Sequence, residues 1–186
     1  GVRLGDPDAA TQRHGLAVPA GIHTLTGVAG LTLGGGLGWL MRRHGLTCDR
    51  LVSARVILAD GARTIAGATG DSDLLWALRG GGGNFGIVTE FEFAAVPLGP
   101  AVFAGAVMHP AEGASELLRW YRDFAAAAPD ELTTIVNLRS APPAPWIPAE
   151  HRGRDVVVVG GCWAGDPSGG ERHLAALRRF GKPLAD

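Results

Sequence analysis

Residues 26–40 read Thr-Gly-Val-Ala-Gly-Leu-Thr-Leu-Gly-Gly-Gly-Leu-Gly-Trp-Leu, and this glycine-rich stretch decides the fold class. It lies inside a longer run, residues 15–41, that holds eight glycines and no Asp, Glu, Lys or Arg. An apolar run of this length could form a membrane-spanning helix, with Arg42 and Arg43 as its basic flank. Each glycine inside a helix costs roughly 0.5–1 kcal/mol relative to alanine. The glycines therefore favour a buried region of turns and strands.

The composition of the 186 residues excludes several classes of protein. The chain is 46% hydrophobic and 19% charged with a net charge of -1, which argues against disorder and against a basic nucleic-acid or membrane surface. Cys48 and Cys162 lie too far apart in sequence for a zinc spacing and do not form a disulfide framework, so no metal site is predicted. No secretory leader stands at Gly1, and the expected location is the cytoplasm, with secretion of a longer parent left open.

Between residues 50 and 97 the pattern predicts a hairpin, a helix and a further strand. Strands are expected over residues 51–59, 63–68 and 87–93, with a helix over residues 73–78. Asp60-Gly61 is the expected hairpin turn, and Asp71 or Ser72 the expected helix cap. In the last strand, strict alternation would place Ile87, Thr89, Phe91 and Phe93 on one face.

Pro97-Leu98-Gly99-Pro100 interrupts both periodicities and predicts a boundary. Beyond it we expect strands over residues 101–108, 132–138 and 156–159 and helices over residues 111–127 and 171–180. The first of these helices is amphipathic, with apolar residues recurring at helical spacing: Leu117, Tyr121, Phe124 and Ala128. The order β-α-β-β-α indicates an α+β module.

Three short motifs suggest other chemistries, and each lacks an essential part. Residues 81–88 match the glycine loop of protein kinases, but that mechanism needs a lysine on a following strand, and the only lysine is Lys182. The same glycines do not fit a Rossmann loop, because such a loop leads into a helix and these residues precede a predicted strand. Gly70-Asp71-Ser72 resembles a serine-hydrolase block without the histidine partner that the serine needs. His44, Cys48 and Asp49 could suggest a metal cluster, but Gly45 interrupts the helical spacing and no second ligand pair follows.

Several blocks, in the same order, resemble the flavin-binding domain of berberine-bridge-enzyme-like FAD oxidoreductases, in the vanillyl-alcohol oxidase superfamily. They are residues 18–21, 26–40, 42–47 and 73–89, with Asp49 and Asp60-Gly61 between them. The resemblance implies an α+β fold. Residues 1–97 would be the second half of a PCMH-type FAD-binding domain, and residues 98–186 would begin an antiparallel-sheet substrate domain.

The resemblance also implies an FAD site made largely of backbone. Residues 26–30 and 34–38 would face the flavin and the pyrophosphate, and main-chain groups of residues 87 and 88 would reach the adenine. The FAD-binding residues so assigned are His23, Thr26, Gly27, Val28, Gly30, Leu33, Gly34, Gly35, Leu37, Gly38, Ile87 and Val88. A Cβ at Gly34, Gly35 or Gly36 would obstruct the cofactor, although strand bending and tight packing are an alternative reason for these glycines.

His23 stands where bicovalent members of the family carry the cysteine that bonds flavin C6. A C6-cysteinyl link is therefore not expected, and any 8α-histidyl link would come from outside this sequence. No residue can be assigned as the catalytic base, so the catalytic residues stay unknown.

The resemblance implies part of an FAD-dependent oxidase or dehydrogenase that transfers hydride from a small organic substrate to flavin N5. The sequence resembles a fragment of such an enzyme, and the 186 residues alone are expected to be inactive. A small-molecule substrate is the expected partner, with no nucleic acid and no membrane. The alternative is a catalytically inert or split-subunit module that acts through protein contacts, as a homodimer or with the missing half of the enzyme.

Overall fold

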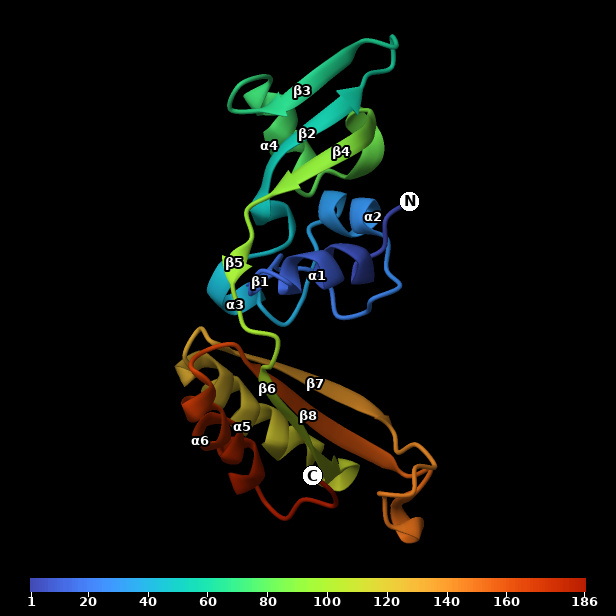
Figure 1. Ribbon diagram of the computed structural model, residues 1–186. Coiled ribbons are helices and arrows are strands. Elements are labelled where there is room, and N and C mark those ends of the chain that lie inside the picture. The colour runs from blue at the N-terminus through green and yellow to red at the C-terminus, as the bar shows by residue number, and fades with distance from the viewer. The chain divides into compact units, whose positions relative to one another are not determined.

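The computed structural model describes residues 1–186 and divides them into two compact units, Gly1–Pro100 and Ala101–Asp186. Figure 1 shows the helices and strands of each unit. The division falls directly after Pro97-Leu98-Gly99-Pro100, where prolines and a glycine prevent either regular structure from continuing. The assignment of the two units to cofactor and substrate stays a prediction.

An antiparallel sheet with the strand order β3-β2-β4 is the centre of the first unit. Its strands are β2 (Leu51–Ile57), β3 (Arg63–Gly67) and β4 (Ile87–Phe93). The predicted hairpin is confirmed, because Leu58 N–H donates to the Ala62 carbonyl at 2.9 Å and Asp60 Oδ1 accepts from Ala62 N–H at 2.9 Å. A short turn of this kind fixes the register of the two strands.

Helix α4 (Ser72–Leu78) supplies part of the core of this unit. Asp71 Oδ1 accepts a hydrogen bond from Leu74 N–H at 2.8 Å, so Asp71 is the cap and Ser72 is the first helical residue. The buried residues of the core are Leu33, Leu51, Ala54, Val56, Ala66 and Leu78. They come from α2 (Val28–Leu33), both hairpin strands and α4, so the core holds these elements together.

Strand β4 has the predicted bounds, but strict alternation of its faces was wrong. Glu90 lies opposite Arg55, whereas Val88 lies opposite Val56, so the register shifts between the two pairs. An extra residue at such a bulge moves the following side chains to the other face. Val88 therefore packs against the core together with Phe91 and Phe93, and Ile87 is exposed.

The glycine-rich region contains a helix where turns and strands were expected. Helix α2 (Val28–Leu33) begins after Gly27, which has an extended backbone, and ends at Gly34. Val28, Thr32 and Leu33 are buried, and the Thr32 hydroxyl donates to the Val28 carbonyl at 2.8 Å. Burial of this face offsets the helical cost of its glycine.

The remaining elements of the first unit are short. They are α1 (Gly5–Gln12), β1 (Leu16–Ala17), α3 (Met41–His44) and β5 (Val96–Pro97), with β1 and β5 paired antiparallel. None of the helices in the structure combines the length and the apolar character that crossing a membrane would require.

The second unit has the predicted order of elements. Its strands are β6 (Phe103–Pro110), β7 (Leu132–Ser140) and β8 (Asp155–Trp163), in the sheet order β6-β8-β7. Its helices are α5 (Ala114–Ala127) and α6 (Gly170–Leu174), which a 3-10 segment (Ala175–Arg179) continues. Leu117 is buried in the core, and Tyr121, Phe124 and Ala128 pack against it, so the amphipathic face of α5 is confirmed.

Candidate functional site

The structure brings the two main groups of predicted FAD-binding residues into one part of the first unit (Figure 1). Helix α2 contacts the 3-10 turn Gly82–Phe85, and β4 begins directly after Gly86. Leu33, at the end of α2, is buried among the core residues beside the sheet. Residues 26–33 and residues 87–88, far apart in the sequence, are thereby placed near each other.

Gly27 and Gly30 are the glycines whose surroundings fit a cofactor that approaches the backbone. A Cβ built on either residue would have no atom of the chain within 4 Å, and both residues are exposed. Packing within the protein therefore gives no reason for glycine at these two positions. An extended ligand lying against α2 would give one, because it could approach the main chain closely only without a Cβ.

Gly36 and Gly38 have a different explanation, which lies within the chain. A Cβ on Gly38 would lie 1.7 Å from the Ala20 carbonyl oxygen, and one on Gly36 would lie 2.4 Å from Thr47 Oγ1. Gly36 also has φ +86°, and Gly35 has φ +107°, a region that favours glycine. At Gly34 a Cβ would meet the Gly30 carbonyl at 3.2 Å. Tight packing or backbone conformation thus accounts for glycine at positions 35, 36 and 38, whereas a Cβ on Gly34 would need its neighbour to move by only a few tenths of an ångström.

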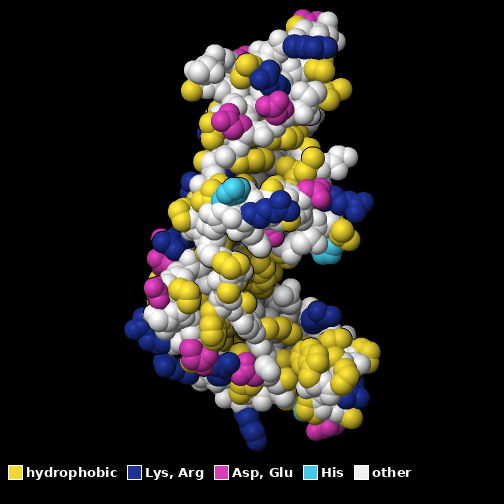
Figure 2. Space-filling view, in the orientation of Figure 1, with side chains coloured by type: hydrophobic (Ala, Val, Ile, Leu, Met, Phe, Trp, Pro, Cys, Tyr) yellow, Lys and Arg dark blue, Asp and Glu magenta, His cyan; other side chains and the backbone are white.

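The side chains of the predicted residues fall into a buried set and an exposed set. Val28 and Leu33 point into the unit, so only their backbone could contact a ligand. Leu37 is 67% exposed and Ile87 is 71% exposed, and Ile22 and Leu25, which precede α2 in the sequence, are also exposed. Figure 2 shows hydrophobic side chains reaching the surface of this unit. Exposed apolar side chains near a glycine backbone are suited to cover one face of a flat aromatic ring.

His23 and Thr26 form the turn that precedes α2. The His23 carbonyl accepts from Thr26 N–H at 3.0 Å, and the His23 ring accepts at Nδ1 from Leu25 N–H at 3.3 Å. Thr26 in turn accepts from Leu4 N–H through its carbonyl at 2.9 Å. The imidazole of His23 is exposed, and its position is set by this local hydrogen bond.

The titratable residues around α3 are structural in character. Burial lowers the pKa of His44, and the neighbouring charges of Arg43 and Arg50 act in the same direction. Burial also raises the pKa of the Cys48 thiol, with a smaller contribution from Asp49. The Asp49 carboxylate accepts from Leu46 N–H at 2.7 Å, so it caps a turn. These groups offer neither a thiolate nor a free carboxylate pair for catalysis.

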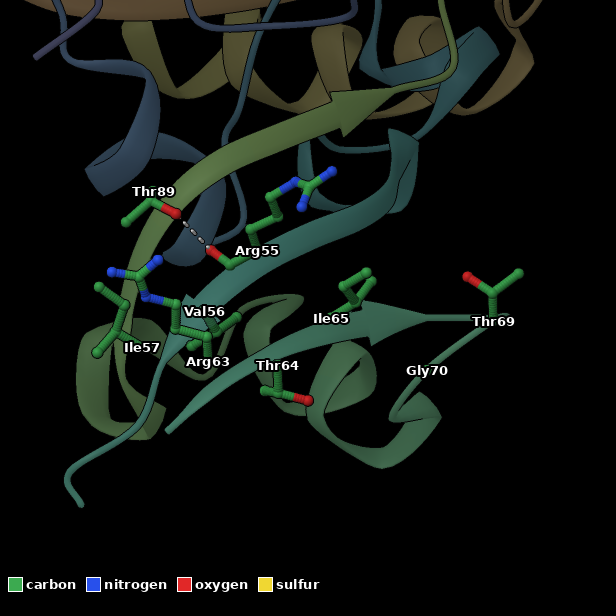
Figure 3. Close-up of a pocket in the computed structure, with 9 residues that line it drawn as sticks. All are labelled: Arg55, Val56, Ile57, Arg63, Thr64, Ile65, Thr69, Gly70 and Thr89. Carbon is green, nitrogen blue, oxygen red and sulfur yellow. Dashed lines mark hydrogen bonds between the residues drawn. The ribbon is translucent and has the colours of Figure 1, made fainter. Parts of the chain in front are cut away.

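A separate pocket lies on the β2–β3–β4 sheet and was not predicted from the sequence. It has a volume of about 690 Å³ and is lined by residues of all three strands and the following turn, as Figure 3 shows: Arg55, Val56, Ile57, Arg63, Thr64, Ile65, Thr69, Gly70 and Thr89. The Arg55 guanidinium pairs with Glu90 at 3.1 Å, and both side chains are largely exposed. None of the predicted FAD-binding residues lines this pocket. Alternation in β2 indicates only that Arg55 faces solvent, so no sequence signal could have identified this pocket.

Comparison with known proteins places these observations in a family. Residues 1–67 match the family model described as FAD binding domain. The chain is 31% identical over 186 residues to an FAD-linked oxidoreductase of Dictyostelium discoideum, and the match covers 99% of this chain and 38% of that protein. The chain therefore spans well under half the length of this relative.

Two solved structures share the fold over nearly the whole chain. One is a 6-hydroxy-D-nicotine oxidase from Arthrobacter nicotinovorans, with a TM-score of 0.84 and 28% identity, covering 100% of this chain and 40% of that one. The other is the glucooligosaccharide oxidase from Acremonium strictum, described with a 6-S-cysteinyl, 8α-N1-histidyl FAD. It has a TM-score of 0.80 and 29% identity and covers 98% of this chain and 37% of that one. The predicted α+β fold with antiparallel sheets is confirmed by these neighbours.

Proposed function

Because the chain belongs to the FAD-linked oxidoreductases, we propose that its first unit forms one wall of an FAD site in an enzyme that oxidises a small organic substrate. The observation that carries this proposal is the open space beside Gly27 and Gly30. These are the two glycines of residues 26–40 at which an added Cβ would meet no atom of the chain within 4 Å and the backbone φ is not positive.

Bound FAD would supply the hydride acceptor, and the protein would supply orientation and exclusion of water. The backbone of residues 26–30 would contact the cofactor directly, since no side chain separates it from a ligand at Gly27 and Gly30. Leu37 and Ile87 would lose exposed apolar surface on binding, which favours association. Buried Val28 and Leu33 would act indirectly, by fixing α2 against the core.

His23 would face the flavin as a hydrogen-bonding group and not as an attachment point. Its ring is exposed and is oriented by the Leu25 amide, so it is available to a ligand. Both cysteines are buried, at 4% exposure each, which supports the expectation that no thioether to flavin C6 forms within this chain. His23→Ala should then keep bound FAD but alter its reduction potential, measured against dyes of known potential. A loss of bound FAD would contradict this role.

Equilibrium dialysis of the purified chain against FAD tests the proposal. We expect saturable binding, weaker than micromolar, because an open wall leaves much of the cofactor in water. Sub-micromolar affinity would contradict the single-wall account, and no binding at millimolar FAD would contradict the FAD site itself. The second outcome would favour the alternative of a module that acts through protein contacts only.

A further inference from the structure

Strand β7 presents an unprotected edge of the second unit's sheet. The strand order β6-β8-β7 leaves one side of β6 and one side of β7 without a strand partner. The edge of β6 is partly covered, since Met108 N–H donates to the Ala185 carbonyl at 2.8 Å and Leu184 N–H donates to the Met108 carbonyl at 2.7 Å. Strand β7 has nine residues, no proline and a single charge, Arg139. Edge strands of this kind pair readily with another strand.

The backbone groups that face outward from β7 can be identified from its hydrogen bonds. The Glu131 carbonyl accepts from Ala164 N–H at 2.9 Å, and Ala141 N–H donates to the Arg154 carbonyl at 2.8 Å. Both bonds continue the pairing with β8, and both involve odd-numbered residues of the β7 segment. Because backbone direction alternates along an antiparallel strand, Thr134, Val136 and Leu138 direct their N–H and C=O groups away from β8.

We propose that β7 pairs antiparallel with β7 of a second copy of this chain, with Ile135 on the two-fold axis. In this register Thr134 of each copy exchanges backbone hydrogen bonds with Val136 of the other, using the outward groups. The same register sets Glu131 of each copy opposite Arg139 of the other. Such a contact is isologous and closes after two copies, as a dimer interface requires.

Charge complementarity selects this register over its neighbours. A shift of the register by one residue would place backbone groups that point out of one strand opposite backbone groups of the other strand that point toward its own β8. The register can therefore shift only in steps of two residues. Those steps would place Arg139 opposite Thr133 or Pro129 and remove both ion pairs. Only the proposed register sets both charged residues opposite a residue of the other sign.

The apolar exposure of β7 agrees with a strand that is covered by its own copy. Ile135 is 38% exposed and Leu138 is 64% exposed. Pairing at the axis would bring the two Ile135 side chains together in a non-hydrogen-bonded pair, where opposed side chains approach most closely.

Sedimentation velocity of the full chain over about two decades of concentration tests the proposal. We expect a species of twice the 19.2 kDa monomer mass to grow with concentration. Arg139→Glu should raise the dimer dissociation constant about tenfold or more, because each Glu131 then faces a like charge. The double variant Glu131→Arg, Arg139→Glu should restore the dimer.

Arg119→Glu is the matched control, since it makes the same charge change at an exposed position on α5 and should leave the dimer unaltered. Circular dichroism confirms that each variant is folded. A chain that stays monomeric at every concentration overturns the proposal. So does a dimer that is insensitive to Arg139→Glu, or a double variant that fails to restore it. FAD binding, which concerns the first unit, is measured separately.

Discussion

Substitution of Gly30 by alanine tests whether this glycine is needed for ligand binding or for the stability of the fold. The new methyl group would meet no atom of the chain within 4 Å, and Gly30 lies inside helix α2. Alanine in a helix interior is favoured over glycine by about 0.5–1 kcal/mol. For a unit of this size, that gain should raise the unfolding temperature by about 2–8 °C. The same methyl group should weaken FAD binding, because it stands between the ligand and the backbone.

Gly38→Ala is the contrasting variant. Its Cβ would lie 1.7 Å from the Ala20 carbonyl oxygen, so the backbone must move, at a cost of about 1–3 kcal/mol. Differential scanning calorimetry gives the stability of both variants, and equilibrium dialysis gives their affinity for FAD. The reasoning is refuted if Gly30→Ala destabilises the first unit, or if it binds FAD as well as the unsubstituted chain does.

Three further outcomes are expected. Leu117→Ala should lower the free energy of unfolding by about 2–5 kcal/mol, measured by urea denaturation, whereas Leu118→Ala, at a 38% exposed position, should lower it much less. Equal losses would contradict the packing of α5. Burial lowers the pKa of His109, so the stability that this residue contributes is present above about pH 6.5 and is lost as the pH falls, because the unfolded imidazole takes up a proton. His109→Phe should flatten the dependence of the unfolding free energy on pH, and an unchanged dependence would contradict this role. Burial raises the pKa values of Cys48 and Cys162, so a thiol reagent should label both only after denaturation, and labelling in the native state would contradict their burial.

Local patterns predicted the elements whose signals are short-range. The Asp60-Gly61 turn between two apolar runs specified the β2–β3 hairpin, and the spacing of apolar residues from Leu117 to Ala128 specified the buried face of α5. Asp71 was predictable as a cap because the carboxylate needs only the amide three residues later.

Tertiary effects explain what the sequence did not predict. Helix α2 contains a glycine and has only six residues, so propensity disfavours it, and burial of Leu33 in the core decides its conformation. Helix α1 buries no residue and therefore has no periodic signal. The bulge in β4 depends on the register against β2, which alternation alone cannot reveal.

The FAD site was predicted from the family resemblance. The structure shows which of its glycines are needed for packing within the protein and which are not. Gly27 and Gly30 face open space, whereas Gly36 and Gly38 are required by Thr47 and Ala20. That distinction depends on contacts between residues distant in sequence, so no local pattern could supply it.

Mapping FAD onto the chain by amide chemical-shift changes tests the central claim most directly. With FAD added to the isotope-labelled chain, we expect the largest changes at residues 23–30, Leu37 and Ile87, with no specific response in residues 101–186. Changes confined to the pocket around Arg55 and Arg63, or no saturable change in the first unit, would contradict an FAD wall formed by α2 and the start of β4.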